Sequence, residues 1–490
     1  MPLLIALVAI VFAGSLILKR YHPQSVLLLT GIALLLIAQF TQGTNLSTLV
    51  NKTTGLGLLD AFEYIRDILS SRTGGLGMQI MLVGGFATYM SVTGASQVLV
   101  RIASRPLQRL NSPYLLLALA LVLGQFLSLF ISSATGLGLL LMATLYPLLI
   151  RLGCSRAAVA AVIASTCAVE FGPGSGNSVL AAKTAGIEVV DYFVNDQLPV
   201  VVPVILFVAL VHALTQRFFD RRTRQEAAAT PHDLADSLNQ GPQAPLLYLL
   251  LPMLPLAIML LCSKLVFSSL RITIDTAVLL SLAIALLCEY VRWRNAREVM
   301  AGVQKVFDTM GGVFASVITL IVAGEIFSAG LKAIGAVDAL LSLSGEAGLS
   351  AASIILMMTL VTFVISALMG SGNAAFFSFA PMIPQISAHI GSDVAVMMLP
   401  VQISAGIGRT LSPIAGVIIA IAGIAGVSPV EIVKRTALPM LSGWLLMIVI
   451  TFLRSGHLLA IVPWLAGLVV VALAAVLLMR LRRKVPQHAA

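Results

Sequence analysis

The sequence predicts an all-α polytopic membrane protein, in which two halves of inverted topology each contain five membrane spans and one re-entrant hairpin. Two observations lead to this fold class. Hydrophobic residues make up 59% of the 490 residues and charged residues only 10%, with a mean hydropathy of +1.02, a balance typical of chains embedded in a bilayer. In addition, the same arrangement of apolar runs and helix-breaking residues occurs twice. With an extra C-terminal span, we expect about 11 spans and about 2 hairpins.

The repeat is visible as aligned Gly, Pro and Ser residues. Residues 131–147 align with residues 365–381 at a constant offset of 234, and residues 173–199 align with residues 413–439 at an offset of 240. An odd number of spans in each half places the second half upside down relative to the first. The sequence therefore predicts an inverted repeat.

Nine uninterrupted apolar runs approach the length of about 20 residues that an α-helix needs to cross a bilayer. The first run has no small-residue cleavage site after it and is followed at once by Lys19 and Arg20. We therefore interpret it as a retained span and not as a signal peptide. The nine runs comprise residues 2–18, 25–40, 78–98, 197–214, 245–261, 277–290, 311–330, 437–452 and 458–479.

Helix-breaking residues interrupt the apolar sequence at four further places. Residues 112–152 and 348–389 each fold around a short polar tip and are predicted hairpins, whereas residues 157–186 and 394–426 are predicted helices broken in the middle. Because an unpaired backbone amide costs several kcal/mol in a bilayer, such breaks are tolerated where they line a cavity in the protein. Kinks in ordinary helices would explain a single break. Matched breaks in two halves are instead typical of a transporter's binding site.

The chain divides into two repeats joined by a polar linker. The first repeat covers residues 1–215, the linker residues 216–243, the second repeat residues 244–453, and an extra span with a basic tail residues 454–490. A cytoplasmic linker puts 21 of the 30 Lys and Arg residues on the cytoplasmic side and 7 outside, as the positive-inside rule requires. Two segments mix charged and apolar residues at helical spacing and are expected to form helices along the membrane interface; they are residues 51–71 and 295–310.

Arg409 and Glu170 are the charged residues predicted to lie at the site. Arg409 stands in the second broken helix, where a guanidinium that keeps its proton and presents a planar fork suits a carboxylate. The alternative is that Arg409 binds orphan carbonyls or neutralises an acid. Repeat position 170 corresponds to position 410, so pseudo-symmetry predicts that Glu170 lies near Arg409. The sequence leaves open whether the two form a permanent pair or whether Glu170 takes up a proton or cation in each cycle.

Polar side chains at the hairpin tips and helix breaks complete the predicted site. Each Ser or Thr alone more often bonds its own helix backbone, so the prediction depends on the cluster. Half-helix N-termini beside these residues offer partial positive charge to a carboxylate, and unwound carbonyls offer a site for Na⁺. The predicted substrate-binding residues are Ser132, Ser133, Thr135, Ser175, Asn177, Ser371, Asn373, Arg409, Thr410 and Ser412.

The other ionisable and thiol groups indicate neither a cofactor nor an enzyme. The four cysteines and six histidines show no CxxC or HExxH spacing, and no His accompanies the Ser clusters as a catalytic base would. Lys and Arg lie in short loops as topology signals, which excludes nucleic acid as a partner. We expect Lys183 to reach the outer interface, the alternative being that it faces substrate. Glu325 and Asp338 are interpreted as structural.

Three segments resemble the DcuC family of anaerobic four-carbon dicarboxylate carriers: SPYLLLALALVLGQFLSLFISSATGLGLLLMATLYP, SGNAAFFSFAPMIPQI and GRTLSPIAGVIIAIAGIAGVSPVEIVKRTALP. The resemblance extends over nearly the whole chain. It implies a bacterial inner-membrane carrier of succinate, fumarate, malate or aspartate, in a superfamily whose hairpins and broken helices slide against a scaffold in an elevator motion. It also implies an apolar residue and then a Pro-Thr-Ser-Gly-Asp run where this chain has Glu170 and then GPGSGN, and a neutral residue in place of Lys183.

We therefore predict a secondary active transporter of small dicarboxylates in the lipid bilayer, working by exchange or with Na⁺ or H⁺ as coupling ion. Members of the superfamily are often homodimers, although the sequence identifies no interface. One alternative is a carrier of another organic anion or of an amino acid, with Glu170 binding the amino group. A second is a cation/proton antiporter that uses Glu170. Arg409 speaks against the second, because a fixed positive charge repels a cation unless Glu170 offsets it.

Overall fold

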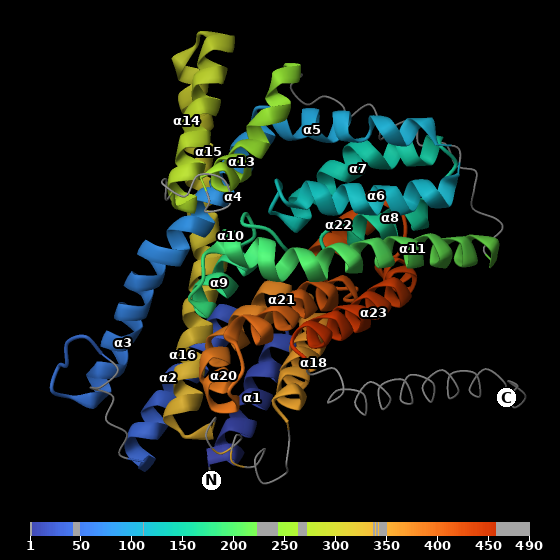
Figure 1. Ribbon diagram of the computed structural model, residues 1–490. Helices are drawn as coiled ribbons and strands as arrows, with labels where there is room; N and C mark the ends of the chain where they lie inside the picture. The colour runs from blue at the N-terminus through green and yellow to red at the C-terminus, as the bar shows by residue number, and fades with distance from the viewer. Residues whose placement is uncertain are drawn as a thin grey trace, which may run out of the picture.

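The computed structural model describes residues 2–42, 50–110, 112–222, 244–262, 272–336, 339, 342 and 350–456, and the regular elements within these ranges are all helices (Figure 1). This confirms an all-helical polytopic fold. Within the described residues, eight helical segments are long and apolar enough to cross a membrane, fewer than the predicted spans. These segments are Pro23–Phe40, Gly57–Val92, Ala134–Arg151, Val189–Arg221, Ile274–Trp293, Ala296–Ala333, Ala351–Met369 and Pro429–Arg454.

The first long helix contains a π-turn. It consists of α3 (Gly57–Arg72), the π-turn (Thr73–Gly77) and α4 (Met78–Val92), which follow one another without a gap. The prediction of a separate interface helix at residues 51–71 is therefore wrong in its boundaries. Its charges have partners within the protein, since Asp60 accepts three hydrogen bonds from the preceding loop.

The second long helix repeats this design in the other half of the chain. α15 (Ala296–Val313) passes through a π-turn (Phe314–Ile318) into α16 (Thr319–Ala333). Residues 295–310, predicted as a second interface helix, form its first part. α15 packs against α4, and the two lie side by side in Figure 1. A π-turn thus occurs in the same place in each long helix, where the sequence analysis expected no special structure.

The N-terminal helices pack on this framework. α1 (Pro2–Leu18) contacts α2 (Pro23–Gln42), and α2 packs closely against α16. A Cβ atom at Gly31 of α2 would lie only 2.7 Å from the backbone nitrogen of Phe327. Small residues of this kind allow helix backbones in a membrane to approach one another.

Two short-helix regions differ from the predicted spans. The predicted span at residues 245–261 is a 3₁₀ helix, η5 (Leu246–Met253), followed by the short α13 (Leu254–Leu261). Pro252 lies within the 3₁₀ segment and, like any proline, it lacks the amide hydrogen that an α-helix would use there. The predicted span at 78–98 ends early as well, because Gly94 adopts φ 81° and turns the chain into a new helix. The helices around these segments are α5 (Ala95–Ala103), η3 (Arg105–Arg109) and α14 (Ile274–Trp293).

Each half contains a helical hairpin. The first hairpin turns through residues 129–133, and its two helices pack against each other. The second has a tighter tip, formed by Gly370 at φ 69° and Ser371. The helices are α6 (Pro113–Ser128) and α7 (Ala134–Arg151) in the first hairpin, and α18 (Ala351–Met369), α19 (Gly372–Phe379), η7 (Ala380–Met382) and α20 (Ile383–Ile390) in the second.

Each half also contains a helix that stops and restarts. In the first half α8 (Arg156–Ser165) is separated from α9 (Gly176–Ala185) by ten residues, 166–175. In the second half α21 (Val394–Thr410) is separated from α22 (Gly416–Ala425) by five, 411–415. α21 packs against α9, so the two broken helices meet near their breaks.

Two long helices complete the described chain. α10 (Val189–Asp191) and a π-turn, η4 (Tyr192–Gln197), lead into α11 (Leu198–Arg222), which packs along α23 (Pro429–Arg454). The linker was predicted to begin at residue 216, but α11 continues through Arg222. Gln216 and Asp220 accept hydrogen bonds from Arg435 of α23, and these contacts stabilise the last turns of α11. Residues 223–243, the predicted span at 458–479, the basic tail and Asp338 lie outside the described residues.

Candidate functional site

The candidate site lies where the two helix breaks meet, and glycines of α21 permit this approach. A Cβ at Gly406 would stand 2.3 Å from the carbonyl oxygen of Ala168 in the first break, and one at Gly408 would stand 2.4 Å from that of Phe363 in the second hairpin. Real Cβ contacts are never so short, so larger residues here would push the elements apart. The sequence thus brings one turn of α21 into contact with both the first break and a hairpin.

Arg409 and Glu170, which pseudo-symmetry predicted to lie near each other, form an ion pair at this crossing. Arg409 Nη1 donates to Glu170 Oε1 at 2.7 Å, and Arg409 Nη2 donates to the carbonyl oxygen of Cys167 at 2.6 Å. The two side chains are 12% and 18% exposed, respectively. Arg409 Nε is buried and has no hydrogen-bond partner among the described residues. The guanidinium is therefore held on one side and retains an unused donor.

Amide side chains hold Glu170 and the unwound segment from the other side. Asn177 Nδ2 donates to Glu170 Oε2, and Gln402 Nε2 donates to the Glu170 carbonyl oxygen at 2.9 Å. Gln402 Oε1 in turn accepts from the Tyr192 hydroxyl at 2.9 Å. Gln197 joins the same network, since its Oε1 accepts from the Gly172 amide at 2.8 Å and its Nε2 lies 3.3 Å from Gln402 Oε1. These bonds fix the break although it lacks helical hydrogen bonds.

The sequence analysis missed this amide network. Gln197 and Gln402 are both completely buried, and each stands within or at the end of an apolar run. A polar side chain at such depth is as informative as the charge of Arg409. The rule that identified Arg409 would have identified both glutamines if it had been extended from charged to amide side chains. Tyr192 and Ser178, which also join the network, carry no such signal.

The first hairpin brings Ser132 to the site. Ser132, Ser175 and Glu170 line one small cavity together with Cys167 and Phe171. Ser175 precedes the first residue of α9 without capping it through its side chain, so the N-terminus of α9 faces this region without a side-chain cap. Of the predicted residues, the structure therefore gathers Arg409, Glu170, Asn177, Ser132 and Ser175.

Other predicted residues bond to their own helices. Ser133 Oγ accepts from the Gly136 amide and Ser371 Oγ from the Ala374 amide, so both serve as helix caps. Thr410 Oγ1 donates back to the Gly406 carbonyl. These three hydroxyls follow the ordinary behaviour of Ser and Thr in helices.

The side chains of the remaining predicted residues, at the hairpin tips and in the second break, have no described hydrogen bond to the Arg409 or Glu170 side chain. Asn373 is in the first turn of α19, whose Gly372 packs against the carbonyl of Ala405 with a Cβ position 2.8 Å away. Thr135 is exposed in the first turn of α7. Ser412 is buried, and its Oγ has no hydrogen-bond partner in the described structure. These residues surround the site in two hairpins and one break, but only the second hairpin touches α21 closely.

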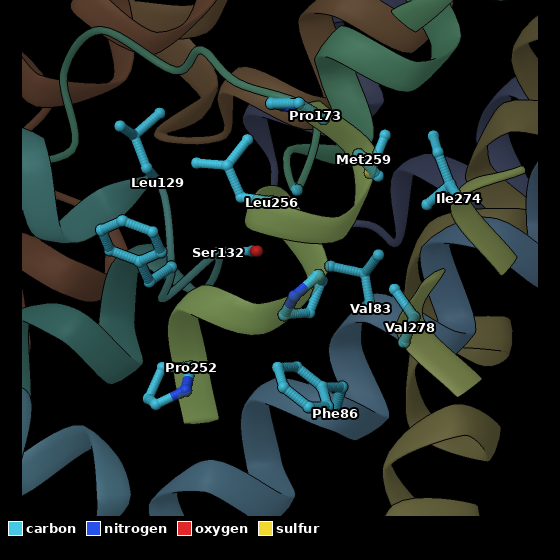
Figure 2. Close-up of a pocket in the computed structure, with 13 residues that line it drawn as sticks. Val83, Phe86, Leu129, Ser132, Pro173, Pro252, Leu256, Met259, Ile274 and Val278 are labelled. Atoms are coloured by element: carbon cyan, nitrogen blue, oxygen red, sulfur yellow. The ribbon is translucent and has the colours of Figure 1, made fainter. Parts of the chain in front are cut away.

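A second cavity, lined almost wholly by apolar side chains, also borders the first hairpin tip. Figure 2 shows Ser132 among Leu256 and Met259 of α13, Phe86 of α4 and Pro173 of the first break. The complete lining consists of Val83, Phe86, Leu129, Phe130, Ser132, Pro173, Gly174, Pro252, Pro255, Leu256, Met259, Ile274 and Val278. The hairpin and break thus meet α4, α13 and α14 across an almost wholly apolar surface.

Lys183 and Glu325 lie away from the ion pair. Lys183 is exposed near the C-terminus of α9, and its Nζ lies 3.0 Å from the position that a Cβ at Gly75 would take. Glu325 of α16 binds Arg72 of α3 through both carboxylate oxygens. Lys183 therefore points to the π-turn of the first long helix and not to Arg409.

In the part of the chain that the structure describes, no three His, Cys, Asp or Glu side chains lie close enough together to hold a metal ion. Two carbonyls of the first break are already used, that of Cys167 by Arg409 and that of Glu170 by Gln402. The arrangement is suited to an organic anion: it presents a guanidinium, amides and an uncapped helix N-terminus.

Comparison with known proteins agrees with this chemistry. A family model described as DcuC, C4-dicarboxylate anaerobic carrier, matches residues 1–456. The anaerobic C4-dicarboxylate transporter DcuC of Escherichia coli K12 is 38% identical over 454 residues, which cover 92% of this chain and 96% of the relative. A probable DcuC transporter from Vibrio cholerae is 37% identical over 450 residues, covering 92% and 97%.

Two solved transporters share the fold at low sequence identity. Neisseria gonorrhoeae MtrF, described as an antimetabolite efflux pump, superposes with a TM-score of 0.57 at 14% identity and covers 88% of this chain and 94% of its own. Alcanivorax borkumensis YdaH, a transporter described as having an unusual topology, gives a TM-score of 0.53 at 16% identity, with coverage of 89% and 99%. This likeness concerns the fold alone.

Proposed function

The chain belongs to the DcuC family of C4-dicarboxylate anaerobic carriers, and from this premise we propose that it carries small dicarboxylates of the succinate, fumarate, malate or aspartate class. As a member of this family it is a secondary transporter and not an enzyme. It is a multi-pass membrane protein, homologous to the DcuC carriers of the bacterial inner membrane.

The observation that supports the substrate class is Arg409 at the meeting of the two helix breaks. A guanidinium presents several donors in one plane and binds a carboxylate more strongly than a neutral donor does. Arg409 anchors one carboxylate of the substrate. The second carboxylate binds near the N-terminus of α9, with Ser132 and Ser175 as hydroxyl partners and the helix dipole as a favourable field.

The other predicted residues form the outer parts of the same site. Asn177 orients Glu170, while Ser133, Thr135, Ser371 and Asn373 belong to the hairpin tips, and Thr410 and Ser412 to the second break. Ser412 supports this role best among them, because its buried hydroxyl has no partner within the described structure. A substrate or a water molecule supplies the missing hydrogen bond.

Transport in this proposal is an elevator motion of an inverted repeat. The two hairpins and two broken helices move together against a scaffold that contains the long helices α3–α4 and α15–α16. Matched breaks and matched π-turns in the two halves support the repeat, and the apolar cavity around Ser132 supports a weakly bonded sliding surface. The scaffold also provides the contact of a homodimer, as is usual for carriers of this design.

Exchange of one dicarboxylate for another, or coupling to Na⁺ or H⁺, drives the cycle. The test is uptake of labelled succinate into proteoliposomes preloaded with fumarate, succinate, aspartate or buffer alone, with and without Na⁺ and a pH gradient. Uptake that needs an internal dicarboxylate identifies an exchanger, and stimulation by one gradient identifies the coupling ion. Absence of uptake under every condition, by protein shown to be folded, would overturn the substrate assignment.

A further inference from the structure

We propose that Glu170 is a built-in competitor for the substrate: its carboxylate occupies Arg409 in the empty carrier and is displaced when a substrate carboxylate binds. The inference rests on the proposed function of Arg409 as the substrate anchor. It assigns Glu170 the role of a residue that sets apparent affinity, since every binding event must first break the Arg409–Glu170 pair.

The geometry of the pair is that of an incomplete and exchangeable contact. One guanidinium nitrogen donates to one carboxylate oxygen at 2.7 Å, and a second donates to a backbone carbonyl. The buried Nε has no partner in the part of the chain that the structure describes. Arg72 and Glu325 show the closed alternative in the same molecule, with two nitrogens on two oxygens. Arg409 thus keeps donor capacity that an incoming carboxylate can use.

The surroundings of Glu170 allow it to leave Arg409. Glu170 lies in the unwound segment between α8 and α9 and lines the cavity that also contains Ser132 and Ser175. Its second oxygen is already held by Asn177. After displacement, Glu170 therefore retains a hydrogen-bond partner, and its side chain borders a small cavity.

Charge balance explains why the empty carrier needs this pair. A buried guanidinium without an anion is strongly unfavourable, and the Arg409–Glu170 pair is formally neutral. A carboxylate of the substrate replaces the carboxylate of Glu170 as the counter-ion of Arg409. Because the binding-competent state is then only a fraction of the empty carrier, the apparent affinity falls by that fraction.

The test compares succinate binding to wild-type carrier and Glu170→Gln in lipid nanodiscs. If Arg409 is free in about a tenth of wild-type molecules, the neutral variant binds succinate about tenfold more tightly. Unchanged or weaker binding by a folded Glu170→Gln variant would overturn the inference. Glu325→Gln is the matched control, because it removes the carboxylate of the other pair and is expected to leave succinate affinity unchanged.

A measurement on the wild-type protein separates displacement from simple charge repulsion, and its refuting outcome does not depend on the folding of a variant. Infrared difference spectra with ¹³C-labelled succinate isolate the carboxylate bands of the protein. Binding is expected to shift a protein carboxylate band that Glu170→Asp alters. No shift in the protein bands on saturation with succinate would refute displacement.

Failure of the inference and failure of the proposed function give different results. If wild-type carrier binds no dicarboxylate, or if Arg409→Ala binds it normally, the proposed function of the site is wrong. If wild-type carrier binds succinate, Arg409→Ala does not, and Glu170→Gln binds no more tightly, only the competitor role of Glu170 is lost.

Discussion

Two of the Arg–carboxylate pairs that join distant parts of this membrane protein, Arg72–Glu325 and Arg409–Glu170, are built in opposite ways. Arg72 of α3 donates through Nε and Nη2 to the two oxygens of Glu325 in α16. Arg409 donates to Glu170 through Nη1 alone and to a backbone carbonyl through Nη2, while its Nε has no partner within the described ranges. The first pair links two long helices, whereas the second joins two helix breaks.

The difference shows why charge at membrane depth is an incomplete guide to function. Both pairs are partly buried: the Arg72 and Glu325 side chains are 34% and 15% exposed, those of Arg409 and Glu170 12% and 18%. The degree of burial alone would therefore not distinguish the two pairs. In the bidentate pair Arg72–Glu325, the closed pair, both carboxylate oxygens accept hydrogen bonds and the contact joins two helices. In Arg409–Glu170, the open pair, the guanidinium keeps a donor for a ligand.

Arg409→Ala is expected to produce the largest effect. It should lower succinate uptake by about 100-fold or more, because truncating one partner of a buried hydrogen-bonded charge pair costs roughly 2–5 kcal/mol. Uptake into proteoliposomes, normalised to inserted protein, measures this. Arg72→Ala is the matched control in the closed pair, and equal losses in the two variants would remove the distinction between them.

Gly406→Ala tests whether the close crossing of α21 and the first break is required. The added Cβ would stand 2.3 Å from the Ala168 carbonyl, and forcing the two apart is expected to cost about 1–3 kcal/mol and to reduce uptake about tenfold. Gly423→Ala is the control, because a Cβ there meets no atom within 4 Å. Normal uptake by Gly406→Ala would show that the crossing is loose.

Tyr192→Phe, which changes the amide network beside the open pair, should have a smaller effect on succinate affinity. The change removes the hydroxyl that donates to Gln402 Oε1 at 2.9 Å, but Gln402 keeps its bond to the Glu170 carbonyl. A lost hydrogen bond of about 1 kcal/mol corresponds to roughly a fivefold decrease in succinate affinity. Titration calorimetry on purified protein measures it. A loss as large as that of Arg409→Ala would mean that the network, and not the guanidinium, dominates binding.

Glu325→Gln should have the smallest effect on substrate and a clear effect on stability. Neutralising Glu325 leaves Arg72 of the closed pair without its counter-charge, so the melting temperature in detergent is expected to fall by several degrees. Succinate affinity should stay within about twofold of wild type, because the pair lies outside the site. A marked loss of affinity with unchanged melting temperature would place Glu325 in the transport mechanism.

The sequence predicted the parts of this arrangement that depend on local chemistry and on the repeat. Gly, Pro and Ser mark the breaks because they disfavour a continuous helix. The repeat register predicted that Glu170 lies near Arg409, and the structure pairs them. Neither inference needed knowledge of tertiary packing.

Features that depend on packing between distant segments escaped prediction. Tyr192 and Gln402 are 210 positions apart, and no local pattern connects them. The ion pair of Arg72 with Glu325, 253 positions away, was likewise not predicted. The hydroxyl of Thr410 looked like a ligand, but it bonds to its own helix, which composition cannot distinguish from a role at the site.

The most direct test of Arg409 as the substrate anchor is an electron cryomicroscopy structure of the carrier in nanodiscs with saturating succinate. We expect a succinate carboxylate within hydrogen-bond distance, about 3 Å, of the Arg409 guanidinium, at the meeting of the two helix breaks. Succinate bound elsewhere, with the side chain of Arg409 making the same contacts as in the empty carrier, would contradict this account.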